Sequence, residues 1–113
     1  MIEKLAKFDV AKHRFNEEFA FRVRNRRNRL LGLWVATRLG FRDDAVEAFA
    51  KWVLGTGIDL PDDQKLARRI ANRCEEIGSP LTSIAIRTEM DRLGAIAALE
   101  FAAVEPPLPS RAA

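Results

Sequence analysis

The sequence predicts an all-α protein, a four-helix bundle with a long first helix and a mobile N-terminal arm. Apolar residues recur at helical spacing in four segments, short links rich in glycine, proline and aspartate separate these segments, and no useful stretch alternates apolar and polar residues as a strand does. The 113 residues, 48% hydrophobic and 31% charged, suit one small domain. We expect the arm at residues 1–14, the bundle at residues 15–105 and a tail at residues 106–113.

The first predicted helix covers residues 15–39, and an extension toward residue 3 also fits the pattern. Gly40 follows it, and the access of glycine to positive φ ends a helix at low cost. Gly32 lies inside the helix at a cost of about 1 kcal/mol relative to alanine, so we expect another helix to approach closely there. Projected at 100° per residue, the apolar stripe consists of Phe15, Phe19, Val23, Leu30, Leu33 and Trp34.

The second predicted helix covers residues 43–54. Asp43 and Asp44 are its candidate N-caps, and Gly55 and Gly57 are expected to end it. An extended connector follows at residues 58–61. The buried face of this helix is predicted to hold Val46, Phe49, Ala50 and Val53, with Trp52 beside them.

The third and fourth predicted helices cover residues 62–77 and 82–104. Asp62 and Asp63 should cap the third helix and Gly78 should end it. Ser79 with Pro80 is one candidate start of the fourth helix, and Thr82 is the rival cap. Their buried faces should hold Leu66, Ile70, Cys74 and Ile77, and Ile86, Met90, Leu93 and Ala97. From all four faces, we expect a mutually close core of Leu30, Trp34, Phe49, Ile70, Met90 and Leu93.

The residues that enzymes and metal sites need are scarce in this chain. It has one histidine, one cysteine and no tyrosine, and it lacks a phosphate-binding loop, a dinucleotide-binding glycine motif and a calcium-loop pattern. We therefore expect neither catalysis nor a cofactor or metal site. The single cysteine suits an intracellular protein, and no apolar run approaches the roughly 20 residues that span a bilayer.

Basic residues are concentrated in the first part of the chain. Residues 1–42 hold eleven lysines and arginines against four acidic residues, a balance of +7, whereas residues 43–113 hold eight against twelve, a balance of −4. Such asymmetry favours an acidic partner for the first part, or docking of a basic helix onto acidic ones within the fold.

An arginine run lies in the middle of the first predicted helix. Arg26 falls inside the apolar stripe and Arg27 at its edge, and a buried charge without a partner is very costly. The run is therefore either a contact surface lined by cations or part of an internal ion-pair network. The candidate internal partners are Asp43, Asp44, Glu89, Asp91 and Glu100. As a surface, the cluster of Arg22, Arg24, Arg26, Arg27 and Arg29 would bind an acidic partner or nucleic acid.

The same run carries a family resemblance. Arg26, Arg27, Asn28, Leu30, Leu31, Gly32 and Trp34 match a signature that reads approximately A-R-R-N-K-L-L-G-x-W. It resembles that of the ATPase-inhibitor zeta subunits of alphaproteobacteria, small all-helical proteins associated with the catalytic sector of F-type ATP synthase. Over residues 18–97 the further matches are Gly40, residues 45–53, Pro61 with Asp62 and Asp63, Ile86 with Arg87, Met90, and Arg92 with Leu93.

The resemblance implies a regulatory subunit that inhibits ATP hydrolysis by the catalytic sector through its N-terminal arm. Such a protein would be cytoplasmic, or held at the inner membrane through ATP synthase. The arm has too little apolar area to order itself, so we expect it to be mobile alone and helical in the complex. The residues expected to contact the partner are Leu5, Phe8, Lys12, Arg14, Phe15 and Phe19.

Overall fold

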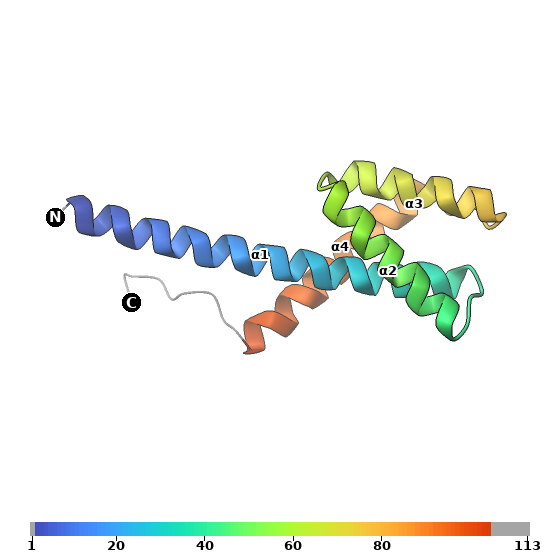
Figure 1. Ribbon diagram of the computed structural model, residues 1–113, viewed down its shortest axis with the longest axis horizontal. Helices are drawn as coiled ribbons and strands as arrows, with labels where there is room; N and C mark the ends of the chain where they lie inside the picture. Colours follow the sequence, from blue (N-terminus) through green and yellow to red (C-terminus); the bar gives the residue numbers. More distant parts are fainter. Residues whose placement is uncertain (1, 105–113) are drawn as a thin grey trace.

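The computed structural model describes the backbone of residues 2–104 and the side chains of residues 13–104. Four α-helices follow one another: α1 (Ile2–Arg38), α2 (Asp44–Asp59), α3 (Asp63–Ile77) and α4 (Ser83–Val104) (Figure 1). Between residues 2 and 104 there is no strand. The predicted all-α bundle is thus confirmed, whereas the predicted tail at residues 106–113 lies outside the described residues.

α1 is the central helix of the arrangement. It packs against both α2 and α4, α4 packs in turn against α3, and α2 meets α3 over a shorter stretch. The N-terminal part of α1 extends beyond the other three helices (Figure 1). The bundle is therefore built around the C-terminal half of α1, and the rest of that helix projects from it.

The first helix begins well before the first predicted bound. The structure shows one continuous helix from Ile2, the extension that the sequence pattern allowed, and there is no glycine or proline before Gly32 to interrupt it. It ends at Arg38, and Gly40 follows with φ +81°, as expected for a helix end. No backbone break separates the arm from the bundle, and the mobility of residues 1–14 stays a prediction.

The core contains most of the residues that helical periodicity predicted. All four residues expected on α4 are buried, namely Ile86, Met90, Leu93 and Ala97. Phe49 and Ile70 are buried as well, while Leu30 and Trp34 are half-buried and pack against the cluster. Val46 and Ile77 are half-buried and also pack against it.

The predicted stripe of α1 does not contain the deepest residues of that helix. Leu31, Val35 and Ala36 are fully buried, although none of them was assigned to the stripe. The physical reason is that α1 is covered from two directions, by α2 and by α4. A helix with two neighbours buries a wider arc than one stripe, and part of that arc was missed.

The prediction that Gly32 lies at a close helix contact is confirmed. A Cβ atom at this position would lie 2.7 Å from the Cα of Ala50 and 3.2 Å from the Cβ of Val53, both on α2. Real Cβ atoms do not approach a backbone so closely, so only glycine fits without a shift. The α1–α2 contact is a backbone-to-backbone packing.

The predicted end of the second helix was wrong. α2 passes through Gly55 and Gly57 and ends at Asp59. At Gly57 a Cβ atom would overlap with the amide nitrogen of Asn28 on α1. Gly57 is therefore a packing residue inside the helix rather than a terminator, and the close α1–α2 contact outweighs its poor helix propensity.

Asp62 caps α3 as predicted, the rival candidate Thr82 caps α4, and Asp43 occupies the predicted N-cap position of α2 without forming the capping bond. The Asp62 carboxylate accepts a hydrogen bond from the Lys65 amide at 2.9 Å, and the Thr82 hydroxyl accepts one from the Ala85 amide at 3.1 Å. Asp43 precedes α2, but its φ is +54° and its side chain makes no capping hydrogen bond. Asp63 lies inside the first turn of α3, which leaves its carboxylate free for another role.

Candidate functional site

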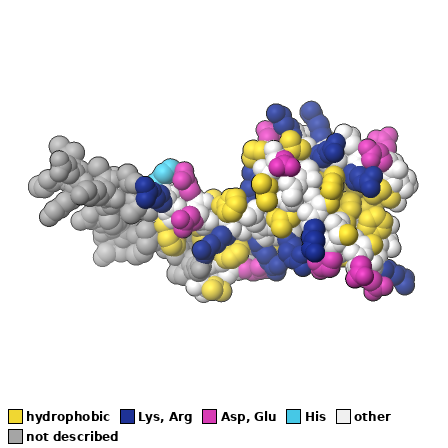
Figure 2. All heavy atoms as spheres, viewed as in Figure 1, with side chains coloured by type: hydrophobic (Ala, Val, Ile, Leu, Met, Phe, Trp, Pro, Cys, Tyr) yellow, Lys and Arg dark blue, Asp and Glu magenta, His cyan; other side chains and the backbone are white. Residues whose placement is uncertain are grey.

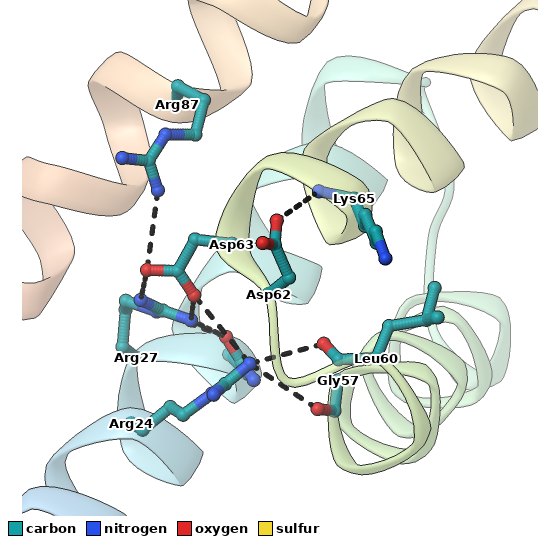
Figure 3. Close-up of polar contacts among 9 residues, drawn as sticks. Arg24, Arg27, Gly57, Leu60, Asp62, Asp63, Lys65 and Arg87 are labelled. Atoms are coloured by element: carbon teal, nitrogen blue, oxygen red, sulfur yellow. Dashed lines mark hydrogen bonds and ion pairs between the residues drawn. The ribbon is translucent and has the colours of Figure 1, made fainter.

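A bidentate ion pair joins α1 to α3 at the centre of the protein. Arg27 Nη1 donates to Asp63 Oδ2, and Arg27 Nη2 donates to Asp63 Oδ1, both at 2.9 Å (Figure 3). The side chain of Arg27 is only 11% exposed and that of Asp63 is 35% exposed. The planar guanidinium matches the two carboxylate oxygens, so this contact fixes orientation as well as distance.

Two more arginines converge on the same carboxylate, and we call the four residues Arg24, Arg27, Asp63 and Arg87 the Asp63 cluster. Arg24 Nη2 lies 3.6 Å from Oδ1, and Arg87 Nη1 lies 3.3 Å from Oδ2. Arg24 Nη2 also donates to the backbone carbonyl of Leu60 at 3.2 Å, just beyond the end of α2 (Figure 3). The cluster therefore connects all four helices.

The surroundings of Asp63 keep its carboxylate charged. Burial alone would raise the pKa of Asp63, but the hydrogen bonds and charge of Arg27 and the charges of Arg24 and Arg87 outweigh burial and lower that pKa. The position of Asp63 in the first turn of α3 also favours a negative charge, because the helix dipole is positive there. A single carboxylate thus faces three guanidinium groups at neutral pH.

Asn28 links this cluster to the α1–α2 contact. Its Oδ1 accepts hydrogen bonds from Nε and Nη2 of Arg27, at 3.0 and 2.8 Å. This fixes the amide so that Nδ2 turns toward Gly57, and Nδ2 has no hydrogen-bond partner among the described residues. The side chain is buried, so Asn28 holds Arg27 in place from inside the bundle.

Of the two alternatives for the arginine run, the internal ion-pair network describes both Arg26 and Arg27, which are at least partly buried and ion-paired. Arg26 Nε donates to Glu100 on α4 at 2.9 Å, and Glu100 was one of the candidate partners. Asp63 was not among the predicted partners of Arg27, because its place at the start of α3 predicts a helix cap. One signal was available, since of two adjacent aspartates only one can occupy the N-cap position. Within the described residues, neither arginine pairs with Asp43, Asp44, Glu89 or Asp91.

The neighbouring arginines and the rest of the signature also contribute to the bundle. Arg29 makes a fork with Glu47 on α2 at 3.1 and 3.2 Å, and Leu31 is fully buried. Trp34 packs at the edge of the core, with the guanidinium of Arg38 5.2 Å from its ring centroid. The arginines at positions 24, 26, 27 and 29 are all engaged inside the fold. This favours the internal ion-pair network over a free cationic surface.

The residues predicted to contact a partner lie on the projecting part of α1. Arg14 is exposed, and Phe15 and Phe19 are half-buried. Leu5, Phe8 and Lys12 belong to the same helix, but their side chains lie outside the described residues. Phe21, which the stripe did not include, is 60% exposed. Figure 2 shows hydrophobic and charged side chains side by side on this part of the molecule.

Two other kinds of site are absent from the region that the structure covers. No group of three or more histidine, cysteine, aspartate or glutamate side chains is placed to hold a metal ion among the described side chains. Of the four described helices, none combines the length and the hydrophobicity needed to traverse a lipid bilayer.

Comparison with known proteins identifies one family. Residues 3–100 match the sequence profile of the family described as ATPase inhibitor subunit zeta. This match starts inside the predicted arm and so extends further than the resemblance over residues 18–97. No curated protein and no solved structure matches the chain. Arg27, Asp63 and Arg87 belong to three separate stretches of sequence that carry the resemblance, and their side chains come together in the Asp63 cluster. The chain therefore belongs to the ATPase inhibitor subunit zeta family, whose name describes an inhibitory, regulatory role.

Proposed function

We propose that this protein inhibits ATP hydrolysis by the catalytic sector of F-type ATP synthase, and that the projecting part of α1 is the element that binds the enzyme. Family membership supports the inhibitory role. The choice of binding element rests on the course of α1, which leaves the bundle as a continuous helix (Figure 1). The sequence of this projecting part contains several aromatic residues.

The order of apolar residues along this part of α1 suits recognition by a groove. Positions 5, 8, 12, 15 and 19 follow one another at alternating intervals of three and four, which places them along one side of a continuous helix. Four of these five positions are leucine or phenylalanine. Amphipathic helices that bind in grooves use anchors with this spacing.

Phe21 adds an apolar residue on a different side of the helix. At 100° per residue it lies about 160° from Phe19, and it is 60% exposed. A helix with apolar residues on two opposite sides buries both only when surfaces close on it from two directions. This favours a cleft between two subunits over a flat surface as the binding site.

The alternative, a module that binds nucleic acid or another polyanion through the Arg22–Arg29 cluster, has less support. A polyanion site needs guanidinium groups that are free to meet phosphates. Arg26 and Arg29 already pair with carboxylates, and Arg27 is buried in its bidentate contact with Asp63. Binding phosphates there would break contacts that hold the helices together.

The test compares the full chain with a variant that lacks residues 1–14, using ATP hydrolysis by the soluble ATPase sector of the same host. We expect the full chain to inhibit and the truncated chain to lose inhibition. The melting temperature should hardly change, because Arg27 is the first fully packed residue of α1 among the described side chains. If the full chain does not inhibit at saturating concentration, the inhibitor function is wrong. If the truncated chain inhibits equally well, the binding element is wrong.

Single substitutions sharpen this test. Phe15→Ala and Phe19→Ala should each raise the concentration for half-inhibition about tenfold or more, as loss of an aromatic anchor does at protein interfaces. Ile84→Ala is the matched control, because Ile84 is 78% exposed on α4 and lies outside the projecting part. An equal effect of all three variants would contradict a specific role for the aromatic residues.

A further inference from the structure

α2 and α3 leave a hollow between them on the surface of the bundle. Its volume is about 490 Å³, and its apolar lining includes Phe41, Phe49 and Trp52. These rings support one another, with centroids 5.8 Å apart for Phe41 and Phe49 and 5.4 Å apart for Phe49 and Trp52. Ala48 on the α2 side is too small to fill the space. The hollow exists because α2 and α3 meet over only a short stretch.

A second hollow continues the first along α2. Its volume is about 590 Å³, it shares Trp52 and Arg69 with the first, and it reaches Thr56 and Leu60. Together the two hollows form what we call the α2/α3 groove. At 1.5 Å per residue, the stretch from Ala45 to Leu60 is about 22 Å long, the length of a helix of four turns. The groove can therefore accept a helix rather than a short peptide end.

The charges in the groove identify the chemistry of its occupant. Arg73 is paired with Glu76 at 3.0 Å. Arg69 lines both hollows and Lys51 lines the second, and neither has a hydrogen-bond or ion-pair partner among the described residues. Among the described side chains that line the second hollow, Asp59 is the one acidic residue. Beside the aromatic floor, the described lining of the groove thus offers two unpaired cations against one unpaired carboxylate, that of Asp59, and Arg69 lies where the two hollows join.

We propose that the α2/α3 groove docks an amphipathic helix of a partner protein, with an apolar stripe on Phe41, Phe49 and Trp52 and a carboxylate opposite Arg69. Figure 2 shows hydrophobic side chains bordered by charged ones on the bundle. The groove belongs to the bundle and not to the projecting part of α1. It is therefore an interaction surface in addition to the proposed inhibitory element.

Two other occupants fit the charges less well. The N-terminal segment of a second copy has five basic residues counting its histidine, against two acidic ones within residues 1–14, so it would bring like charge to Arg69. Nucleic acid needs a row of cations that follows successive phosphates, whereas two unpaired cations line this groove. A helix with acidic flanks matches both the floor and the charges.

The test uses the full chain with Trp34→Phe, which leaves Trp52 as the single tryptophan of the two in the sequence. The probes are two 18-residue helical peptides with the same leucine stripe, one with glutamates and one with lysines on its flanks. We expect the acidic peptide to shift the Trp52 emission and to bind at least about threefold more tightly. Arg69→Glu should weaken the acidic peptide about threefold to tenfold and strengthen the basic one.

Arg68→Glu is the matched control, because it changes the net charge equally at an exposed residue of α3 that does not line the groove. It should change the affinity for either peptide by less than about twofold. Equal binding of the two peptides, or equal effects of Arg68→Glu and Arg69→Glu, would overturn the proposal. If the protein self-associates and Arg69→Glu abolishes this, the occupant of the groove is a second copy. If a single-stranded oligonucleotide binds more tightly than the acidic peptide, the occupant is nucleic acid. Either result would overturn the proposal as well. These outcomes do not depend on whether the protein inhibits ATP hydrolysis.

Discussion

Gly32→Ala should destabilise the bundle, although alanine is the better helix former. The new Cβ would lie 2.7 Å from the Cα of Ala50, so α1 and α2 must separate slightly. Overpacking of this kind costs about 1–3 kcal/mol. The gain in helix propensity is about 1 kcal/mol and opposes that cost. The net change in the free energy of unfolding is then a loss of about 0–2 kcal/mol.

Gly55→Ala isolates the packing term, because Gly55 is also inside a helix but a Cβ atom there would meet no other atom within 4 Å. This variant should gain about 1 kcal/mol from propensity alone. The two variants should therefore differ by about 1–3 kcal/mol, which is the overpacking cost. For a domain of this size that difference separates the melting temperatures by at least about 4 °C. Thermal melts followed by circular dichroism would measure it, and equal stabilisation by both substitutions would refute a close contact at Gly32.

Three further predictions concern the Asp63 cluster and the core. Arg27→Met should lower the free energy of unfolding, measured in urea, by about 2–3 kcal/mol. Arg29→Met, which breaks the more exposed ion pair with Glu47, should lower it by about 0–1 kcal/mol. Equal effects of the two substitutions would contradict the central position of Arg27. Because folding lowers the pKa of Asp63, its stabilisation is present above about pH 4 and is lost as the pH falls through the folded-state value. The stability gap between wild type and Asp63→Asn should thus narrow in acid, and a gap that widens there would be inconsistent with this. Burial raises the pKa of the Cys74 thiol, so Cys74 should react with a thiol reagent only after unfolding, and rapid reaction in the native protein would show that the core is open.

Periodicity predicted the helices and much of their buried faces. α4 is the clearest case, since its four expected core residues are all buried. Periodicity was less informative for α1. Asn28 and Gly32 lie in the middle of its buried arc, and neither is a residue type that the sequence pattern assigns to a core. Their burial depends on the path of α2, which no local pattern of α1 contains.

Predictions based on single-residue preferences were wrong where a tertiary contact set the conformation. Gly57 reads as a helix end from sequence but lies inside α2 beside Asn28. Asp63 reads as a cap but is the carboxylate on which three arginines converge. The sequence predicted that the arginine run needs acidic partners, yet the choice among many carboxylates requires the relative positions of the helices.

The continuity of α1 has a consequence for how its projecting part becomes ordered. Starting a helix from a free chain carries a nucleation factor of about 10⁻³, equivalent to about 4 kcal/mol, whereas extending an existing helix does not. Since the bundle holds the C-terminal half of α1 in helical form, it acts as a permanent template from which the N-terminal residues can wind. A peptide of residues 2–14 alone would have to nucleate its own helix and should bind its target far more weakly. If the projecting part of α1 binds the enzyme as proposed, the bundle would contribute to that binding at a distance, by removing the nucleation step.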